Sequence, residues 1–206
     1  MLTTIAKDQI SGDAYLNLSC PVCGCLPVPH FKNDGYFIDR CPDCGLGYVR
    51  NVPSEATRAT YGRNAAKSAP VTQSRWSRRI EKFWVAKSIA RHAKGRSRLL
   101  EIHGCQGRFF NLRYPDEHFD FVVGLHVLDR AHHLAEFLRE IRRVLSEHGR
   151  AYFVVPRCKY IEPPDRLWRF SVPALHHLFA YHGFRVLFVR RLFGRSQLAV
   201  LAEKLY

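Results

Sequence analysis

The sequence lacks a long apolar run. No stretch approaches the ~18 uninterrupted apolar residues that indicate a membrane span. Residues 1–10 carry Lys7 and Asp8 and lack the apolar centre of a secretory signal, which predicts a cytoplasmic protein. Internal repeats and low-complexity tracts are also missing. The 206 residues, 47% of them hydrophobic, suit one ordinary domain, or one small domain with an appendage, and are enough for a packed core.

Acidic residues are scarce. There are 18 Asp and Glu against 32 Lys and Arg, so the formal net charge is +14. A strongly positive field attracts nucleic acid, acidic partners or anionic surfaces without distinguishing among them. A solvated basic surface with no partner explains the same composition.

Cysteine is confined largely to two tight pairs. Four of the seven cysteines form CxxC…CxxC, with seventeen residues between the pairs: Cys20, Cys23, Cys41 and Cys44. Two such turns supply four thiolates for tetrahedral zinc, and a glycine follows each pair where the chain must bend. With four protein ligands, the predicted site is closed and structural. The alternative is two coincidental or redox pairs; Cys25 and His30 are not expected to be ligands.

A linker and a basic helix are predicted next. Pro53, Ser54 and Gly62 indicate a linker with a short helix beginning near Ser54. From Ser74 to Lys94, apolar residues recur at steps of three and four and predict an amphipathic helix. Its expected apolar face comprises Trp76, Ile80, Phe83, Trp84, Ala86, Ile89 and Ala90. The other face is cationic apart from Glu81. It suits phosphates or acidic protein, and equally an ordinary packed helix with a solvated surface.

The remaining chain alternates between predicted strands and helices. Residues 98–110, RLLEIHGCQGRFF, pass from an apolar strand ending in an acid to a small-residue turn, which is typical of the first turn of a nucleotide-binding α/β domain. Strands are expected at 99–102, within 114–124, and at 150–156, 184–189 and 196–203, with helices at 134–147 and 171–182. This order predicts an α/β fold with a mostly parallel sheet covered on both faces. The expected organisation is a zinc ribbon at 1–52, a linker and basic helix at 53–98, and a shortened α/β domain at 99–206.

Four segments resemble class I S-adenosylmethionine-dependent methyltransferases that carry an N-terminal zinc ribbon. Residues 115–123 (PDEHFDFVV) are similar to the family's turn into its fourth strand, and 137–145 (FLREIRRVL) to the helix that follows. Residues 170–186 are similar to the last helix and sixth strand, and 54–61 to the segment after the ribbon. The resemblance implies a Rossmann-like fold, S-adenosylmethionine as cofactor and methyl transfer as activity.

The chain departs from the family where the cofactor binds. The family shows an acid followed by Gly-x-Gly-x-Gly; here Glu101 matches the acid and Gly107 the third glycine, while Gly104 matches only with a one-residue shift. His103 and Cys105 replace the first two glycines and place a Cβ against the cofactor. Only residues 109–113 stand where the family has its second and third strands, so the ribose acid and the adenine contact have no counterpart. The first strand is then left at an exposed edge, to be covered by the helix, the ribbon or a partner.

Catalytic residues are less well defined. The family often has Glu-His after His-Val-Leu, whereas Asp129-Arg130 follows here. Asp129 is a candidate carboxylate base, and His126 a candidate proton acceptor, as are the neighbouring His132 and His133. Cys105 beside His103 is a further candidate nucleophile.

Three functions follow from these observations. The first is a methyltransferase-fold zinc protein without a cofactor pocket, which acts as a binding or scaffold subunit through its basic surface or open sheet edge. The second is an active methyltransferase whose minimised pocket is completed by a second chain. The third is a nucleic-acid-binding module that uses the ribbon and the basic helix over residues 75–98.

Overall fold

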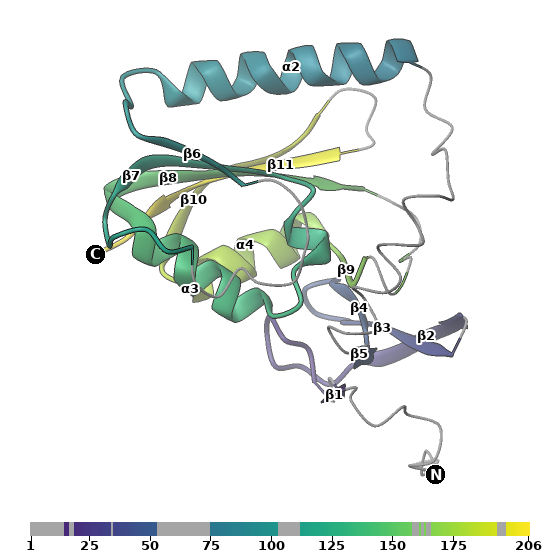
Figure 1. Cartoon of the computed structure of the whole chain (residues 1–206). Coiled ribbons are helices and arrows are strands. Elements are labelled where there is room, and N and C mark those ends of the chain that lie inside the picture. The colour runs from purple at the N-terminus through teal and green to yellow at the C-terminus, as the bar shows by residue number, and fades with distance from the viewer. Residues whose placement is uncertain are drawn as a thin grey trace.

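The computed structural model describes residues 15–16, 19–33, 35–52, 75–102, 112–157, 161, 163, 166–192 and 197–206. In this part of the chain, a large sheet lies between helices, and a small sheet packs below one end of it (Figure 1). Within the described residues, no helix has the length and apolar character needed to cross a membrane.

The large sheet has five strands in the described residues, ordered β10-β11-β8-β7-β6. Their bounds are β6 Leu99–Ile102, β7 Phe119–Leu125, β8 Leu145–Pro156, β10 Phe184–Arg191 and β11 Gln197–Lys204. The β6–β7 and β7–β8 pairings are parallel, whereas β11 runs antiparallel to both β8 and β10. The predicted α/β class is confirmed, with a mixed sheet whose parallel half ends at β6.

Helices cover both faces of this sheet (Figure 1). Helix α2, Arg75–Ala93, lies across one face, and α3, Leu134–Val144, and α4, Val172–Tyr181, lie on the other. Because side chains alternate along a strand, each strand contributes to two cores. Under α2 the core contains Val85 with Phe121, Tyr152 and Leu201. The opposite core is larger and continues into the small sheet.

The small sheet combines distant parts of the chain. Its antiparallel order is β2-β3-β4-β9, with β2 Val28–Asn33, β3 Tyr36–Arg40, β4 Gly47–Val49 and β9 Trp168–Arg169. A separate two-stranded pair joins β1, Tyr15–Leu16, to β5, Asn51–Val52. Strand β9 belongs to the C-terminal half and pairs Trp168 with Tyr48. The ribbon is therefore built into the α/β domain through a shared sheet.

The buried face of α2 differs from the predicted one. Phe83, Ala86 and Ala90 are exposed, whereas Val85 and Ser88 are buried. Ser88 tolerates burial because its hydroxyl oxygen accepts a hydrogen bond from the Tyr152 hydroxyl at 2.9 Å. The spacing of apolar residues does not identify such a buried position, because serine is a polar residue type even where a hydrogen bond allows its burial.

Helix α3 is shorter than predicted. It ends at Val144, and β8 begins at Leu145, so Gly149 lies inside the strand and does not end the helix. Leu145 is fully buried and pairs with Phe119, which draws the chain into the sheet. The helix predicted near Ser54 lies outside the described residues.

Candidate functional site

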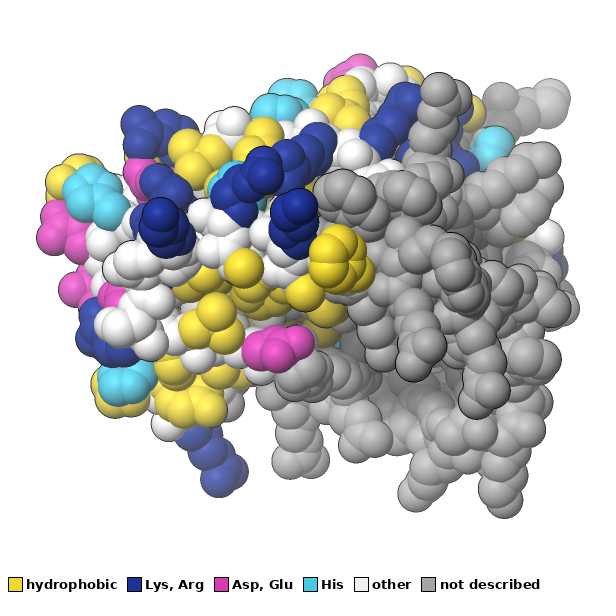
Figure 2. All heavy atoms as spheres, turned by 90° about the horizontal axis from the view of Figure 1, so that it is seen from above, with side chains coloured by type: hydrophobic (Ala, Val, Ile, Leu, Met, Phe, Trp, Pro, Cys, Tyr) yellow, Lys and Arg dark blue, Asp and Glu magenta, His cyan; other side chains and the backbone are white. Residues whose placement is uncertain are grey.

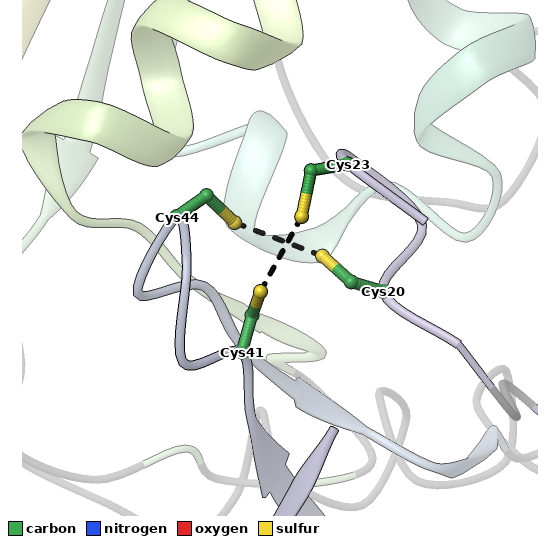
Figure 3. Close-up of side chains that lie close together, drawn as sticks. All are labelled: Cys20, Cys23, Cys41 and Cys44. Atoms are coloured by element: carbon green, nitrogen blue, oxygen red, sulfur yellow. Dashed lines mark hydrogen bonds between the residues drawn. The ribbon is translucent and has the colours of Figure 1, made fainter. Parts of the chain in front are cut away.

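Two cysteine pairs converge at the end of the ribbon (Figure 3). The Sγ atoms of Cys20 and Cys44 are 3.7 Å apart, and those of Cys23 and Cys41 are 3.4 Å apart. All four sulfur atoms lie within 4.8 Å of one another. Sulfur ligands at ~2.3 Å from a tetrahedral zinc lie ~3.8 Å from each other. The cluster therefore has the dimensions and the donors of a closed zinc site.

The two CxxC turns have the same hydrogen bonds. The Gly24 N–H donates to the Cys20 carbonyl at 2.8 Å, and the Gly45 N–H donates to the Cys41 carbonyl at 3.1 Å. Both glycines have positive φ angles, +75° and +71°, which side chains rarely adopt. These turns hold each pair of thiols on the same side of the backbone and aim them at the other pair.

The thiols differ in acidity. Burial raises the pKa of Cys20 to about 11, and it also raises the pKa of Cys44. At Cys41 burial acts in the same direction, but hydrogen bonds from the Cys44 N–H and from neighbouring thiols outweigh it and lower the pKa to about 7. A divalent cation would displace the remaining protons, as at other thiolate sites.

Cys25 and His30, which are not expected to be ligands, lie outside the cluster. The Cys25 thiol donates to the carbonyl of Leu26 at 3.5 Å, and the ring of His30 is exposed and packs edge-on against Phe31. Neither residue belongs to the four-sulfur group.

The cysteine cluster is anchored to α4. Ser171 precedes this helix and caps it, because its hydroxyl oxygen accepts a hydrogen bond from the Ala174 N–H at 3.0 Å. The same hydroxyl donates to the carbonyl of Cys44 at 2.5 Å. A Cβ at Gly45 would lie 3.2 Å from this oxygen, so the second cysteine turn packs directly on the cap.

His126 lies at the carboxyl end of β7, the edge at which α/β sheets bind ligands. Its φ is +55°, and its N–H donates to the carbonyl of Val154 at 2.8 Å. Its Nε2 is 3.1 Å from the side-chain nitrogen of Gln197. Burial, reinforced by Arg166 and Arg130, lowers the pKa of His126 to about 4. The ring is therefore neutral near pH 7, where it can accept a hydrogen bond but is a weak base.

Asp129 lies nearby in the short helix η2, Leu128–Arg130, and is 1% exposed. Its carboxylate is 3.5 Å from the Nε of Arg166, and its carbonyl accepts from the Leu167 N–H at 2.9 Å. Arg166 thus connects both predicted catalytic candidates, since its charge also acts on His126. Sequence reasoning missed Arg166 and Gln197, because nothing distinguishes them within their segments.

The predicted cofactor residues are only partly described. Glu101 is exposed in β6, where it pairs with Val123 of β7. Gly104 and Gly107 lie outside the described residues, as do His103 and Cys105. The two remaining loop histidines contact each other: Nδ1 of His132 is 3.2 Å from Nε2 of His133.

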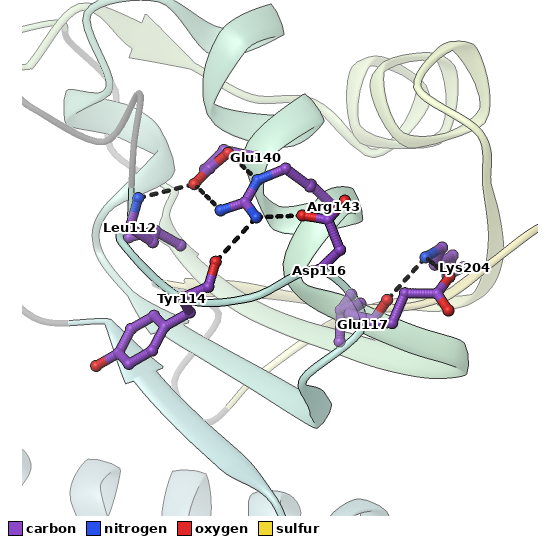
Figure 4. A network of polar contacts seen from close by, with 8 residues as sticks. Leu112, Tyr114, Asp116, Glu117, Glu140, Arg143 and Lys204 are labelled. Carbon is purple, nitrogen blue, oxygen red and sulfur yellow. Dashed lines mark hydrogen bonds and ion pairs between the residues drawn. The ribbon is translucent and has the colours of Figure 1, made fainter.

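A polar network occupies the opposite end of the sheet (Figure 4). Arg143 of α3 donates to Glu140 at 2.6 and 2.8 Å, to Asp116 at 2.5 Å and to the carbonyl of Tyr114 at 2.9 Å. The other contact of Glu140 is the Leu112 N–H, at 2.7 Å. The network lines an open groove and fixes the chain that enters β7. No local pattern in the sequence indicates this network, because most of its contacts join residues 27 to 29 apart along the chain.

Part of the chain is similar to known proteins. Residues 84–153 match the family model described as a methyltransferase domain. No curated protein matches the sequence.

Solved structures resemble the fold at low sequence identity. A 1,6-didemethyltoxoflavin-N1-methyltransferase from Burkholderia thailandensis, with S-adenosylhomocysteine bound, has a TM-score of 0.57 at 15% identity, over 86% of this chain and 99% of that one. A protein from Pyrococcus horikoshii OT3 has a TM-score of 0.51 at 13% identity, over 70% and 98%. An S-adenosylmethionine-dependent methyltransferase from Methanosarcina mazei reaches 0.39 at 17%, over 48% of this chain and 65% of its own length. At such identities the likeness to the first two structures establishes the fold alone.

Proposed function

We propose that this chain, which has the class I methyltransferase fold and a cysteine cluster able to hold zinc, lacks a working cofactor pocket and serves as a binding or scaffold subunit. The proposal also includes the site residues expected from the sequence. It places the domain boundaries near residues 52 and 98 and the protein in the cytoplasm.

The end of the sheet at β6 is the observation that carries the proposal. Within the described residues β6 pairs with β7 alone, so no strand lies beyond it. Nine residues, 103–111, separate the end of β6 from Leu112, which is fixed to Glu140 of α3. A strand–helix–strand connection needs a dozen or more residues for its crossover alone. The family's second and third strands therefore have no counterpart in this interval.

The missing strands matter energetically. In the family, the end of the second strand carries the acid that binds the ribose hydroxyls, and the loop after the third supplies the adenine contact. A charge-assisted hydrogen bond contributes about 1.5–3 kcal/mol, and each 1.4 kcal/mol changes affinity about tenfold. The loss of several such contacts together with a pocket wall should weaken nucleoside binding by several orders of magnitude.

The same edge suits a binding role. Backbone N–H and C=O groups at the edge of a sheet pair readily with an added strand. Leu99 is 44% exposed on β6, and Glu101 is exposed on the same strand. A partner strand that pairs with β6 would extend the sheet. Zinc on the four thiolates would hold the ribbon in place without taking part in chemistry.

Isothermal titration of the zinc-loaded full chain with S-adenosylmethionine tests the proposal. We expect no saturable binding up to about 1 mM cofactor. Micromolar binding by the monomer would overturn the proposal, particularly if Glu101→Ala abolishes it and Glu147→Ala, an exposed acid on β8, does not.

The edge at β6, which has no further strand within the described residues, also supports a second candidate: an active methyltransferase whose pocket is completed by another copy of the chain. In that case, sedimentation should show a dimer, and cofactor binding should strengthen with protein concentration. A monomer that fails to bind at any concentration would exclude this candidate.

A further inference from the structure

We infer that the outer face of α2, together with the adjoining edge of β10, is a binding surface for the phosphate backbone of a nucleic acid. Residues 75–98 contain nine Lys and Arg and one acid, a net charge of +8 out of the chain's +14. More than half of the excess charge therefore belongs to one helix and the turn after it. This inference goes beyond the proposed function, because it does not depend on whether the sheet binds a cofactor.

The structure arranges these charges as a stripe. Lys87, Arg91 and Lys94 are exposed at steps of four and three residues along α2 and the turn after it, so they follow one side of the helix. At ~1.5 Å per residue they are spaced ~6 and ~4.5 Å along the axis of the helix. Phe83 precedes them on the same side and is 63% exposed.

Strand β10 adds an exposed arginine that contacts the sheet-facing side of α2. Arg190 is exposed, donates to the Ser88 hydroxyl at 2.7 Å, and lies 4.5 Å from the Phe188 ring centroid. This contact joins the side chains of β10 to those of α2 across the gap between them. Arg190, Arg91 and Arg150 together help burial to lower the pKa of His92, as expected where positive charges are concentrated. Figure 2 looks down on this face and shows Lys and Arg side chains gathered across it.

Acidic groups near this surface are already engaged by other arginines. Glu203 accepts from Arg150 at 3.0 Å and from Arg185 at 2.5 Å. Asp120 accepts from Arg98 at 2.7 Å. Both carboxylates are therefore held by arginines outside the stripe of Lys87, Arg91 and Lys94.

The chemistry of the surface favours nucleic acid over a protein or a membrane. Protein interfaces have an apolar centre and few lysines, whereas here Lys87, Arg91 and Lys94 alternate with the small Ala86 and Ala90. Insertion of a helix into a membrane interface needs an exposed apolar face, and in the described part of α2 Val85 and Ile89 are packed on the sheet. A linear cationic array beside one aromatic ring matches the non-specific binding of nucleic acid strands.

Fluorescence anisotropy of the full chain with a 20-nucleotide RNA, and separately with a 20-base-pair DNA duplex, tests the inference. We expect micromolar binding at low salt that weakens steeply as salt rises. Lys87→Glu combined with Arg91→Glu should weaken binding at least tenfold and flatten the salt dependence. Phe83→Ala should weaken binding of single-stranded RNA more than binding of the duplex.

The matched control combines Arg40→Glu on the ribbon with Arg139→Glu on α3, which changes the net charge by the same amount elsewhere. It should keep most of the affinity, and circular dichroism should show all variants folded. Equal weakening by both double variants would overturn the inference, since net charge alone would then explain the binding. So would the absence of binding at low salt, or binding to anionic vesicles or polyglutamate without binding to either nucleic acid.

Discussion

The hydroxyl of Ser171 donates a hydrogen bond to the carbonyl of Cys44 at 2.5 Å while it accepts one from the Ala174 N–H. One side chain thus caps α4 and holds the second cysteine turn. Ser171 therefore joins the cysteine cluster to the α/β domain. The pairing of β9 with β4 of the ribbon is a second connection between the two.

Replacement of Ser171 by alanine should destabilise both parts. The loss of a cap costs about 0.5–2 kcal/mol, and the unpaired Cys44 carbonyl adds about 1 kcal/mol or more. Urea unfolding should show the total, and zinc should be released faster to a chelator. Ser97→Ala, at an exposed serine with one long hydrogen bond of 3.4 Å, should change stability by less than about 0.5 kcal/mol. Equal effects of the two variants would contradict the double role.

Zinc content should follow the four converging sulfur atoms. We expect one zinc per chain, measured by elemental analysis, and its loss with unfolding of the ribbon in Cys20→Ser combined with Cys44→Ser. Cys25→Ser is the matched control, because Cys25 lies beside the cluster but outside it, and it should keep the metal. Full zinc content in the first variant would show that the cluster does not bind metal in this way.

Stability should depend on pH through His126. Its pKa of about 4 lies below the ~6.5 of an unfolded chain, so the unfolded state takes up the proton first as the pH falls. Stability from this group is complete above pH ~6.5 and declines toward pH 4 by up to roughly 3 kcal/mol. His126→Asn tolerates the positive φ and removes the titration. Urea unfolding between pH 7 and 4 should show a shallower decline in this variant; parallel curves would contradict the assignment.

Gly124 should resist substitution. A Cβ there would overlap the ring of Phe153 and lie 2.6 Å from a methyl group of Val127, both buried. We expect Gly124→Ala to cost about 1–3 kcal/mol in thermal or urea unfolding, because overpacking forces neighbours from their positions. Phe153→Leu should recover part of this loss in the double variant. Strict additivity of the two changes would mean that the overlap is not the cause.

Local signals in the sequence predicted several elements well. Strand β6, Leu99–Ile102, has the predicted bounds, and the helix predicted at 171–182 is present as α4, Val172–Tyr181. Glycines after the two CxxC motifs have the positive φ angles that tight turns require. Each of these features depends on neighbours within a few residues, so residue type and spacing are sufficient to identify it.

Features that depend on distant contacts could not be predicted in this way. The buried face of α2 includes Ser88 because the Tyr152 hydroxyl, 64 residues later, donates to it. Arg166 joins Asp129 to the surroundings of His126 only because the chain folds back before β9. Arg143 donates hydrogen bonds to Tyr114 and Asp116, which are 29 and 27 residues away, as well as to Glu140 of its own helix.

The sequence by itself determined the α/β class, the four-cysteine cluster and the concentration of positive charge in residues 75–98, because periodicity, ligand spacing and composition are local properties. Only the tertiary structure decided which side of α2 faces solvent, which strand completes the ribbon sheet and which arginine accompanies the buried carboxylate. These outcomes depend on packing and on hydrogen bonds between residues far apart in the chain. Such contacts cannot be recognised from a short stretch of sequence.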